Sequence, residues 1–564
     1  MKKIYQLLTY DKIMTIMKNI FLFILFASCL ISGVFANNIE SINISSRANI
    51  NESQIRVYCY EKIRCDTILV NKFYINNHFK PVWIHNNKLN VIAIQLINKL
   101  QNAELEGLDP KKYHIESIGD LVKKMNNLSA DSSTIVDLEL SLTNAFFLYT
   151  SDLAFGKINN RKFYPKWIIK KRSFDLIALL NQVVSTQNLE SALTIINPKF
   201  IGYYALKNAL HQYQRIAIDG GFESIPQGIA LKLRSKGKRV ELLHKRLIAT
   251  GELNPNFIES YNEYSDATKN AVMLFQQNSG IHPTGVLDKA TLKALNIPIN
   301  TLIDKISINM DRMRWLPNNL ESSYIWVNIP DFSLHVVENN HNILTMPIIV
   351  GKVGTKSCVL DSNIQYMELN PYWNVPKSIA ITDILPKLRE SPDYLEKKGY
   401  TAYKYKISDN TKVDGDEVDW RTVSATNLQY IFRQNPNKHN ALGQIKFIFP
   451  NECGIYLHDT SQHYLFKNQW RAYSHGCIRV GKPIELASFL LRDQPKYTTN
   501  VIESQIQLGK RKVIPLKHKE EVHIVYLTSW VNESGQLQFR PDIYKIDNFK
   551  LNVNIKKTSK SPQL

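Results

Sequence analysis

The feature that most constrains the fold is a change in hydrophobic periodicity near residue 323. Before this point apolar residues recur at helical spacing, as in 91–105, 136–155 and 203–216. After it, apolar and polar residues alternate in 324–329 and 332–337, which is typical of β-strands. The sequence therefore predicts a multidomain α+β protein, and its 564 residues would make about three or four domains.

The helical part is predicted to divide at a linker rich in glycine and proline near residue 226. Residues 37–225 predict a helical scaffold domain, because their amphipathic segments carry no cluster of reactive side chains. Residues 226–300 predict a small three-helix bundle, with apolar faces that include Val240, Ala271 and Ala290.

The β part is predicted to carry an insertion. Residues 320–515 predict a mostly-β domain, within which residues 377–440 are charged and helix-prone. An insertion of this length inside a β domain is a candidate lid. Residues 516–564 predict a C-terminal hairpin and tail, with strands expected at 522–526 and 537–539.

The N-terminal segment, residues 1–36, predicts a signal peptide. Lysines at positions 2, 3, 12 and 18 precede an apolar run over 20–35, which is followed by the small residue Ala36. The run approaches the length of a membrane span, so an uncleaved membrane anchor is the alternative. In both cases we expect the rest of the chain to lie outside the cytoplasm.

The charge of the chain indicates the kind of partner to expect. Seventy Lys and Arg against fifty Asp and Glu give a net charge of +20, which favours polyanions. Because the chain is expected to be exported, we predict no nucleic-acid partner. A cell-envelope polymer or lipid headgroups fit the charge instead.

Export also changes what the cysteines mean. Five remain after residue 36, so at least one is free or pairs with another chain. Cys59 and Cys65 are close enough in sequence to close a small loop. Together with Cys358 and Cys453 they allow three pairings, which the sequence leaves open.

The remaining cysteine lies in a reactive cluster. Cys477 follows Gly476 and precedes Arg479, and His458 ends a probable strand. A cysteine nucleophile needs a base, which His458 could supply. Gly476 lets the backbone approach so that N–H groups could line an oxyanion site. Arg479 lies on the same side as Cys477 if the segment is extended, where it could hold a substrate carboxylate.

A zinc site is the alternative interpretation of this region. Its candidate ligands are His458, Asp459, His463, His475 and Cys477. Their spacing fits no common ligand motif, and no general-base Glu lies beside them as in H-E-x-x-H. We therefore predict no metal and no cofactor.

The motifs around Cys477 resemble a known family. His458 followed by Ser474-His475-Gly476-Cys477 resembles the signature of the L,D-transpeptidase catalytic domain of the YkuD type. The flanking segments 350–352, 370–376, 440–447 and 456–460 resemble the large periplasmic branch of that family, which has a scaffold and a lid. The signature often has Asn where this chain has Arg479, and we take arginine as specific to the branch.

A second resemblance lies upstream of the β part. The series Phe275-Gln276-Gln277, Thr284-Gly285 and Thr291-Leu292 resembles the three-helix peptidoglycan-binding module of wall hydrolases. The resemblances together imply a periplasmic enzyme that acts on peptidoglycan peptide stems.

The family resemblance implies a role for each site residue. Cys477 would attack the third residue, a diamino acid, of a donor tetrapeptide stem and release D-Ala through a thioester. His458 would be the general base, and His475 would support the nucleophile. The residues implied to bind substrate are Trp373, Tyr456, Ser474 and Arg479.

Two rival functions remain open at this level. The chain could be a peptidoglycan-binding scaffold with an inactive catalytic domain, or a zinc peptidase that cleaves the same stems. The sequence also leaves open which acceptor takes the acyl group: another stem, water, a free D-amino acid or a protein.

Overall fold

The computed structural model describes residues 50–58, 67–126, 131–157, 167–169 and 172–547. The predicted signal peptide and the Cys59 and Cys65 pair lie outside these residues. None of the helices in these ranges is both long enough and apolar enough to span a membrane.

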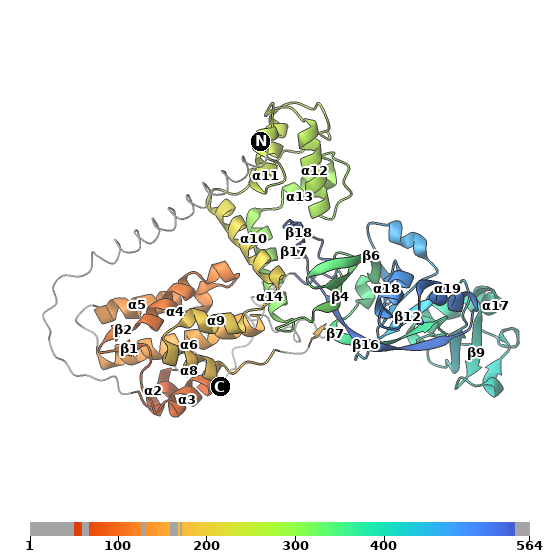
Figure 1. Cartoon of the computed structure of the whole chain (residues 1–564), viewed down its shortest axis with the longest axis horizontal. Coiled ribbons are helices and arrows are strands. Elements are labelled where there is room, and N and C mark those ends of the chain that lie inside the picture. Colours follow the sequence, from red (N-terminus) through yellow and green to blue (C-terminus); the bar gives the residue numbers. More distant parts are fainter. Residues whose placement is uncertain (1–49, 59–66, 127–130, 158–166, 170–171, 548–564) are drawn as a thin grey trace. The chain divides into compact units, whose positions relative to one another are not determined.

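The N-terminal region is helical, as its periodicity predicts (Figure 1). Its centre is α6, whose side chains are buried on nearly all sides. Glu139 of α6 accepts the backbone N–H groups of 82–84, which ties the preceding loop to this helix. The helices are α2 (Glu52–Val57), α3 (Thr67–Asn76), α4 (Val91–Gln101), α5 (Ile115–Asn126), α6 (Ser132–Phe155), α8 (Leu176–Thr186), α9 (Leu189–Ile196) and α10 (Ile201–Ile218).

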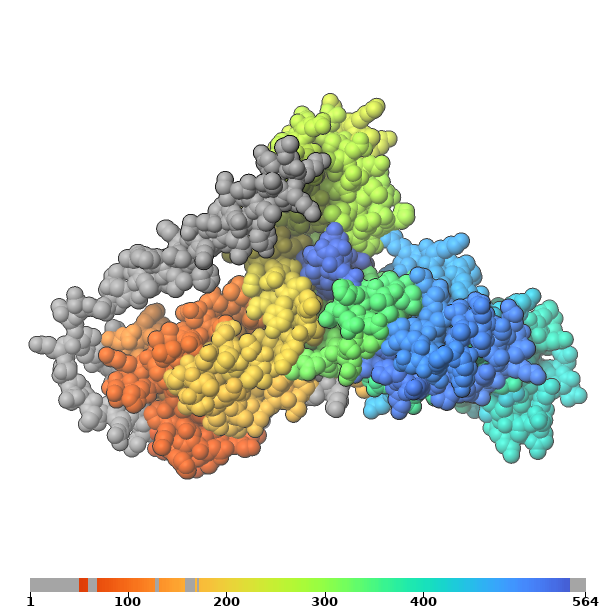
Figure 2. All heavy atoms as spheres, viewed as in Figure 1, coloured from red at the N-terminus to blue at the C-terminus, as the bar shows by residue number. Residues whose placement is uncertain are grey.

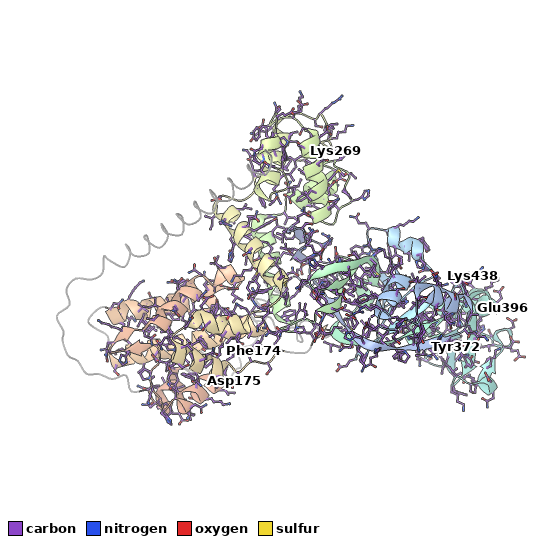
Figure 3. The ribbon with its side chains drawn as sticks, viewed as in Figure 1. Phe174, Asp175, Lys269, Tyr372, Glu396 and Lys438 are labelled. Carbon is purple, nitrogen blue, oxygen red and sulfur yellow. A yellow bond between two sulfur atoms is a disulfide. The ribbon has the colours of Figure 1, made fainter. Side chains whose placement is uncertain are left out.

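Side-chain caps fix where several of these helices begin. Asp175, labelled in Figure 3, accepts the N–H groups of Ile177 and Ala178 and so starts α8. A short hairpin, β1 (Ile84–His85) with β2 (Lys88–Leu89), precedes α4.

A small helical module follows, made of α11 (Lys238–Ala249), α12 (Asp266–Asn278) and α13 (Lys289–Leu295). The buried amide of Gln276 holds it together. Its nitrogen donates to the hydroxyl of Thr291 (2.9 Å), and its oxygen accepts the N–H of Gly285 (2.9 Å). The Gln276, Thr284-Gly285 and Thr291-Leu292 series of the sequence therefore forms a hydrogen-bond network that holds the helices of this module together.

The helix α14 (Ile299–Arg314) leads from this module into the β region. Its Arg314 is fully buried and donates to the carbonyl oxygen of Glu106 (2.6 Å) and the hydroxyl of Tyr203 (2.9 Å). These bonds join α14 to the N-terminal helices, which explains why a buried arginine is tolerated here.

The main sheet closes on itself. Its order is β12-β13-β15-β6-β5-β4-β16-β7, and β7 pairs again with β12, while β3 adds to β7 and β14 to β6. Two helices accompany it, α18 (Pro483–Leu490) and α19 (Thr499–Gln507). The strands are β3 (Trp167–Ile168), β4 (Ser323–Asn328), β5 (Ser333–Glu338), β6 (His341–Gly351), β7 (Val359–Leu369), β12 (Ile445–Ile448), β13 (Leu457–His458), β14 (Ala472–Ser474), β15 (Ile478–Val480) and β16 (Lys512–Val525).

The predicted insertion is a folded unit with its own sheet and core (Figure 2, cyan). The sheet order is β10-β9-β11-β8, and Leu388, Trp420 and Phe432 are buried in its core. The strand β8 (Trp373–Asn374) precedes the insertion and completes its sheet. The elements of the insertion are α15 (Lys377–Ile379), the π-helix η6 (Ala380–Ile384), α16 (Leu385–Glu390), α17 (Tyr394–Lys398), β9 (Tyr400–Lys404), β10 (Lys412–Val413) and β11 (Tyr430–Gln434).

Short 3₁₀ turns connect several of these helices and strands. They are η2 (Ala103–Glu106), η3 (Pro110–Tyr113), η4 (Pro255–Phe257), η5 (Val353–Thr355), η7 (Asp409–Thr411), η8 (Gly415–Glu417) and η9 (His463–Lys467).

The expected strand pairing of the C-terminal hairpin was wrong. Residues 522–526 do not pair with 537–539, because 522–525 form the end of β16 and lie between β4 and β7 in the main sheet. The hairpin is instead β17 (Ser529–Val531) with β18 (Leu537–Phe539). The expected boundary at 515/516 therefore falls inside a strand. His458 ends a strand as expected, but that strand, β13, is only two residues long.

Candidate active site

Strand alternation places four polar side chains on one face of the sheet. Leu457 of β13 pairs in parallel with Ile478 of β15, and both are completely buried in the core. Because alternate side chains point to opposite faces, the residues flanking these two point away from the core. Those residues are Tyr456, His458, Cys477 and Arg479.

The backbone at Cys477 is held from both sides. The hydroxyl of Ser474 donates to the carbonyl of Cys477 (2.5 Å) and accepts the N–H of Gly476 (3.1 Å). From the other side, the hydroxyl of Ser357 donates to the carbonyl of Gly476 (2.7 Å) and accepts the N–H of Gly351 (2.9 Å). Gly476 has a φ of +125°, a conformation that favours glycine.

Ser474 thus acts within this loop. It is 3% exposed and its hydroxyl is occupied twice by the backbone, whereas the resemblance implied a contact with substrate. Ser357 has the same supporting role, and no motif indicated it. The sequence pattern that could have indicated Ser357 is a small polar residue followed by a cysteine just before a strand.

The His458 side chain is oriented as a proton acceptor. It is 4% exposed, and its Nδ1 lies at hydrogen-bond distance from the carbonyl oxygen of Asp459. A carbonyl can only accept, so Nδ1 carries the hydrogen and Nε2 has the free lone pair. Burial, aided by the positive charge of Arg479, lowers the pKa of His458 to about 3.

The thiol of Cys477 is half-buried, and burial raises its pKa above the usual value. Hydrogen bonds from Tyr456 and the charges of Lys446 and Arg479 act in the opposite direction but do not overcome burial. The resting site therefore holds a neutral thiol and a neutral imidazole.

The structure adds Lys446 to this face. Lys446 of β12 pairs with His458 of β13, and its Nζ lies 4.0 Å from the centroid of the Tyr456 ring. Burial lowers its pKa. The sequence signal was available, since Lys446 is a polar residue between the buried Ile445 and Phe447.

The remaining predicted residues lie at the edge of this group or beyond it. Arg479 donates to the side chain of Gln462 (2.8 Å). His475 lies 3.6 Å from the carboxylate of Asp383, which belongs to the π-helix of the insertion. Trp373 lies in β8, just before the insertion, and its ring packs against Tyr400 of the insertion at 6.3 Å between centroids.

The cysteine pairing left open by the sequence is partly resolved. Cys358 and Cys453 form a disulfide across 95 residues of sequence. Cys477 is the free cysteine among the described residues. The disulfide begins at the residue after Ser357, so it anchors the segment that supports the loop of Cys477.

The zinc alternative lacks a ligand cluster. In the parts of the chain that the structure describes, no three His, Cys, Asp or Glu side chains come close enough to hold a metal ion. Asp459 accepts the N–H of Gln444 (2.8 Å) and pairs with His463 (3.0 Å).

Comparison with known proteins agrees with this geometry. Residues 322–513 match the model of the L,D-transpeptidase catalytic domain, 236–295 that of a peptidoglycan binding domain, and 69–210 that of a scaffold domain. A Haemophilus influenzae protein that carries the name L,D-transpeptidase is 32% identical over 268 residues, which are 46% of this chain and 53% of that protein. The chain thus spans about half the length of this curated relative.

Solved structures of two bacterial L,D-transpeptidases are also similar. The protein from Xylanimonas cellulosilytica is 14% identical, with 53% of this chain and 99% of that chain covered and a TM-score of 0.17. The protein from Stackebrandtia nassauensis is 14% identical, with 52% and 94% covered and a TM-score of 0.21. At such TM-scores the assignment rests on the sequence matches. Residues 322–513 therefore belong to the L,D-transpeptidase family, joined in one chain to a peptidoglycan-binding domain and a scaffold domain.

Proposed function

We propose that this protein is a peptidoglycan L,D-transpeptidase that uses Cys477 as its nucleophile. The observation that carries the proposal is the free, half-buried thiol on the same sheet face as a histidine whose Nε2 is unprotonated. The match of residues 236–295 to a peptidoglycan binding domain supports the wall polymer as the substrate. Action in the periplasm, after export, follows from that substrate.

The reaction proceeds in two balanced steps. In the first, the sulfur of Cys477 bonds to the carbonyl carbon of the third residue of a donor tetrapeptide while His458 takes the thiol proton. The peptide C–N bond then breaks, His458 returns the proton to the leaving nitrogen, and D-Ala departs. In the second, the side-chain amine of another stem attacks the thioester carbon while His458 takes a proton from its nitrogen. The C–S bond breaks, a new amide forms, and His458 returns the proton to the sulfur of Cys477.

The neutral resting pair determines when the thiol is activated. Because burial disfavours both charged forms, the proton leaves Cys477 only as the sulfur attacks, when the developing charge moves onto the substrate oxygen. The backbone N–H of Cys477 would stabilise that oxygen, because the N–H of Gly476 is bonded to Ser474. Tyr456 and Arg479 would position the donor stem, and the insertion, which reaches His475 through Asp383, would cover it.

The test is intact-mass spectrometry of the mature protein incubated with a disaccharide-tetrapeptide. We expect a thioester adduct, released D-Ala and cross-linked dimer with the wild type, and none of these with Cys477→Ala. The conservative Cys477→Ser variant controls for packing at the site. Binding without turnover in the wild type would favour the inactive scaffold. Turnover that persists in Cys477→Ala and stops with a chelator would favour the zinc peptidase.

A further inference from the structure

A row of three charged side chains and the neutral His458 crosses the sheet beside the thiol. The register pairs Arg479 of β15 with His458 of β13, His458 with Lys446 of β12, and Lys446 with Glu368 of β7. The proposed base is therefore flanked by a cation on each side. When the carbonyl of a donor peptide is bound at Cys477, the peptide chain would therefore have one cation near its N-terminal side and one near its C-terminal side.

The ammonium of Lys446 is uncommitted although the side chain is half-buried. Within residues 50–547, as far as the structure describes them, its Nζ has no hydrogen-bond or ion-pair partner and lies over the Tyr456 ring at 4.0 Å. Tyr456 in turn hydrogen-bonds to Cys477. The three N–H groups of Lys446 are thus free to donate, and the Tyr456 ring lies next to both this ammonium and Cys477.

The acidic neighbour that could neutralise Lys446 is engaged elsewhere. The guanidinium of Arg511 holds the carboxylate of Glu368 with two bonds, from Nη2 (2.8 Å) and Nε (3.2 Å). Bidentate arginine–carboxylate pairs are stronger and more specific in geometry than single hydrogen bonds between neutral groups. Arg511 therefore keeps Glu368 from closing an ion pair with Lys446.

The opposite cation is less available. Arg479 already donates from Nη1 to Gln462, and its Nε, although it has no hydrogen-bond partner, is buried out of reach of solvent. Lys446 is thus the better candidate to receive an anion that arrives with the substrate.

We propose that Lys446 forms a subsite for the C-terminal carboxylate of the donor stem, carried by the residue that leaves. This inference rests on the proposed function, because the leaving residue of a tetrapeptide carries a free carboxylate one residue beyond the attacked carbonyl. Neighbouring residues are about 3.8 Å apart, so that carboxylate stays close to the Tyr456 ring when the carbonyl is at Cys477. The subsite selects donors that end directly after the leaving residue.

The test compares two donors that differ in one group. A disaccharide-tetrapeptide and its C-terminal primary amide are offered to the wild type, and kcat/KM for formation of the thioester is measured by mass spectrometry. A charge-assisted hydrogen bond predicts a preference for the carboxylate of about 10- to 100-fold. Lys446→Gln should reduce this preference to nearly one; the readout is the ratio of the two rates, because an effect of the lost charge on the Cys477 thiol acts on both donors alike.

Three further variants sharpen the assignment. Lys446→Arg should retain most of the preference, and Lys438→Gln, which removes the same charge at an exposed site in the insertion, should retain all of it. Arg511→Gln frees Glu368 to pair with Lys446 and should lower the preference.

The outcomes separate the two proposals. A full preference in Lys446→Gln overturns the subsite, as does a preference that is lost in Arg479→Gln but kept in Lys446→Gln. The amide donor reports on folding, because a misfolded variant would lose both rates. If the wild type forms no thioester with either donor, the proposed function itself is wrong.

Discussion

The neutral resting state of the proposed catalytic pair makes a sharp prediction about thiol reactivity. Burial raises the pKa of Cys477 above its ordinary value of 9.0, so less than about 1% of the thiol is ionised at pH 7. Burial also lowers the pKa of His458 to about 3, so no imidazolium is present to stabilise a thiolate. An ion pair of the kind found in papain-like enzymes is not expected here.

Alkylation by iodoacetamide measures the thiolate directly. Since the thiolate is the reactive form, the rate at Cys477 should rise about tenfold per pH unit between about pH 5 and pH 8. Peptide mapping follows the reaction at Cys477 by itself, because Cys358 and Cys453 are paired whereas Cys59 and Cys65 lie outside the described residues. Samples taken at each pH give the rate.

The variant His458→Asn tests whether His458 acts as a base during attack or as the ion-pair partner of a resting thiolate. If His458 acts only during attack, the variant should lose thioester formation from the stem and keep the same pH dependence of alkylation. A plateau of the wild-type rate between about pH 5 and pH 8, removed by His458→Asn, would refute the neutral pair.

Three other predictions concern stability and positioning. Burial by itself would lower the pKa of His523, but the paired carboxylates of Asp361 and Glu521 overcome it and raise the pKa from 6.5 to about 9. The stability that wild type has over His523→Gln should therefore be present in full, about 3 kcal/mol, below pH 6.5 and be lost as pH rises through 9; urea titrations at each pH test this, and a constant difference would contradict it. Replacing both Cys358 and Cys453 by Ser should lower the free energy of unfolding by about 4 kcal/mol, since the disulfide closes a loop across 95 residues; an unchanged urea midpoint would show that the loop is constrained without it. Ser357→Ala leaves a buried N–H and a carbonyl of the loop without their partner, which should cost about 2 kcal/mol and slow thioester formation more than alkylation; equal slowing of the two rates would argue against a positioning role.

Much of the site could be predicted because its residues lie in short segments of sequence whose pattern can be recognised by itself. Strand alternation alone places Cys477 and Arg479 on one side, and the short motif around His458 needs only one neighbouring strand. The periods of the helices and of β4 to β6 are likewise local, and the structure confirms the α+β organisation.

What could not be predicted depends on long-range pairing. Lys446 reaches the site because β12 lies beside β13, and Ser357 reaches Gly476 across 119 residues of sequence. The Cys358–Cys453 bond joins two loops that only the closed sheet brings together. Residues 522–525 look like one arm of a hairpin by themselves, and it is the parallel contact with β4 that makes them part of the main sheet.

The course of β16 also determines how the enzyme can be dissected. The matched catalytic region ends at residue 513, but β16 continues to Val525 and fills the place between β4 and β7. A fragment cut at 513 would leave both of those strands with unpaired backbone groups, and exposed strand edges promote association between molecules. The smallest soluble catalytic fragment should therefore extend beyond residue 525, so the limits of sequence similarity and the limits of autonomous folding differ in this chain.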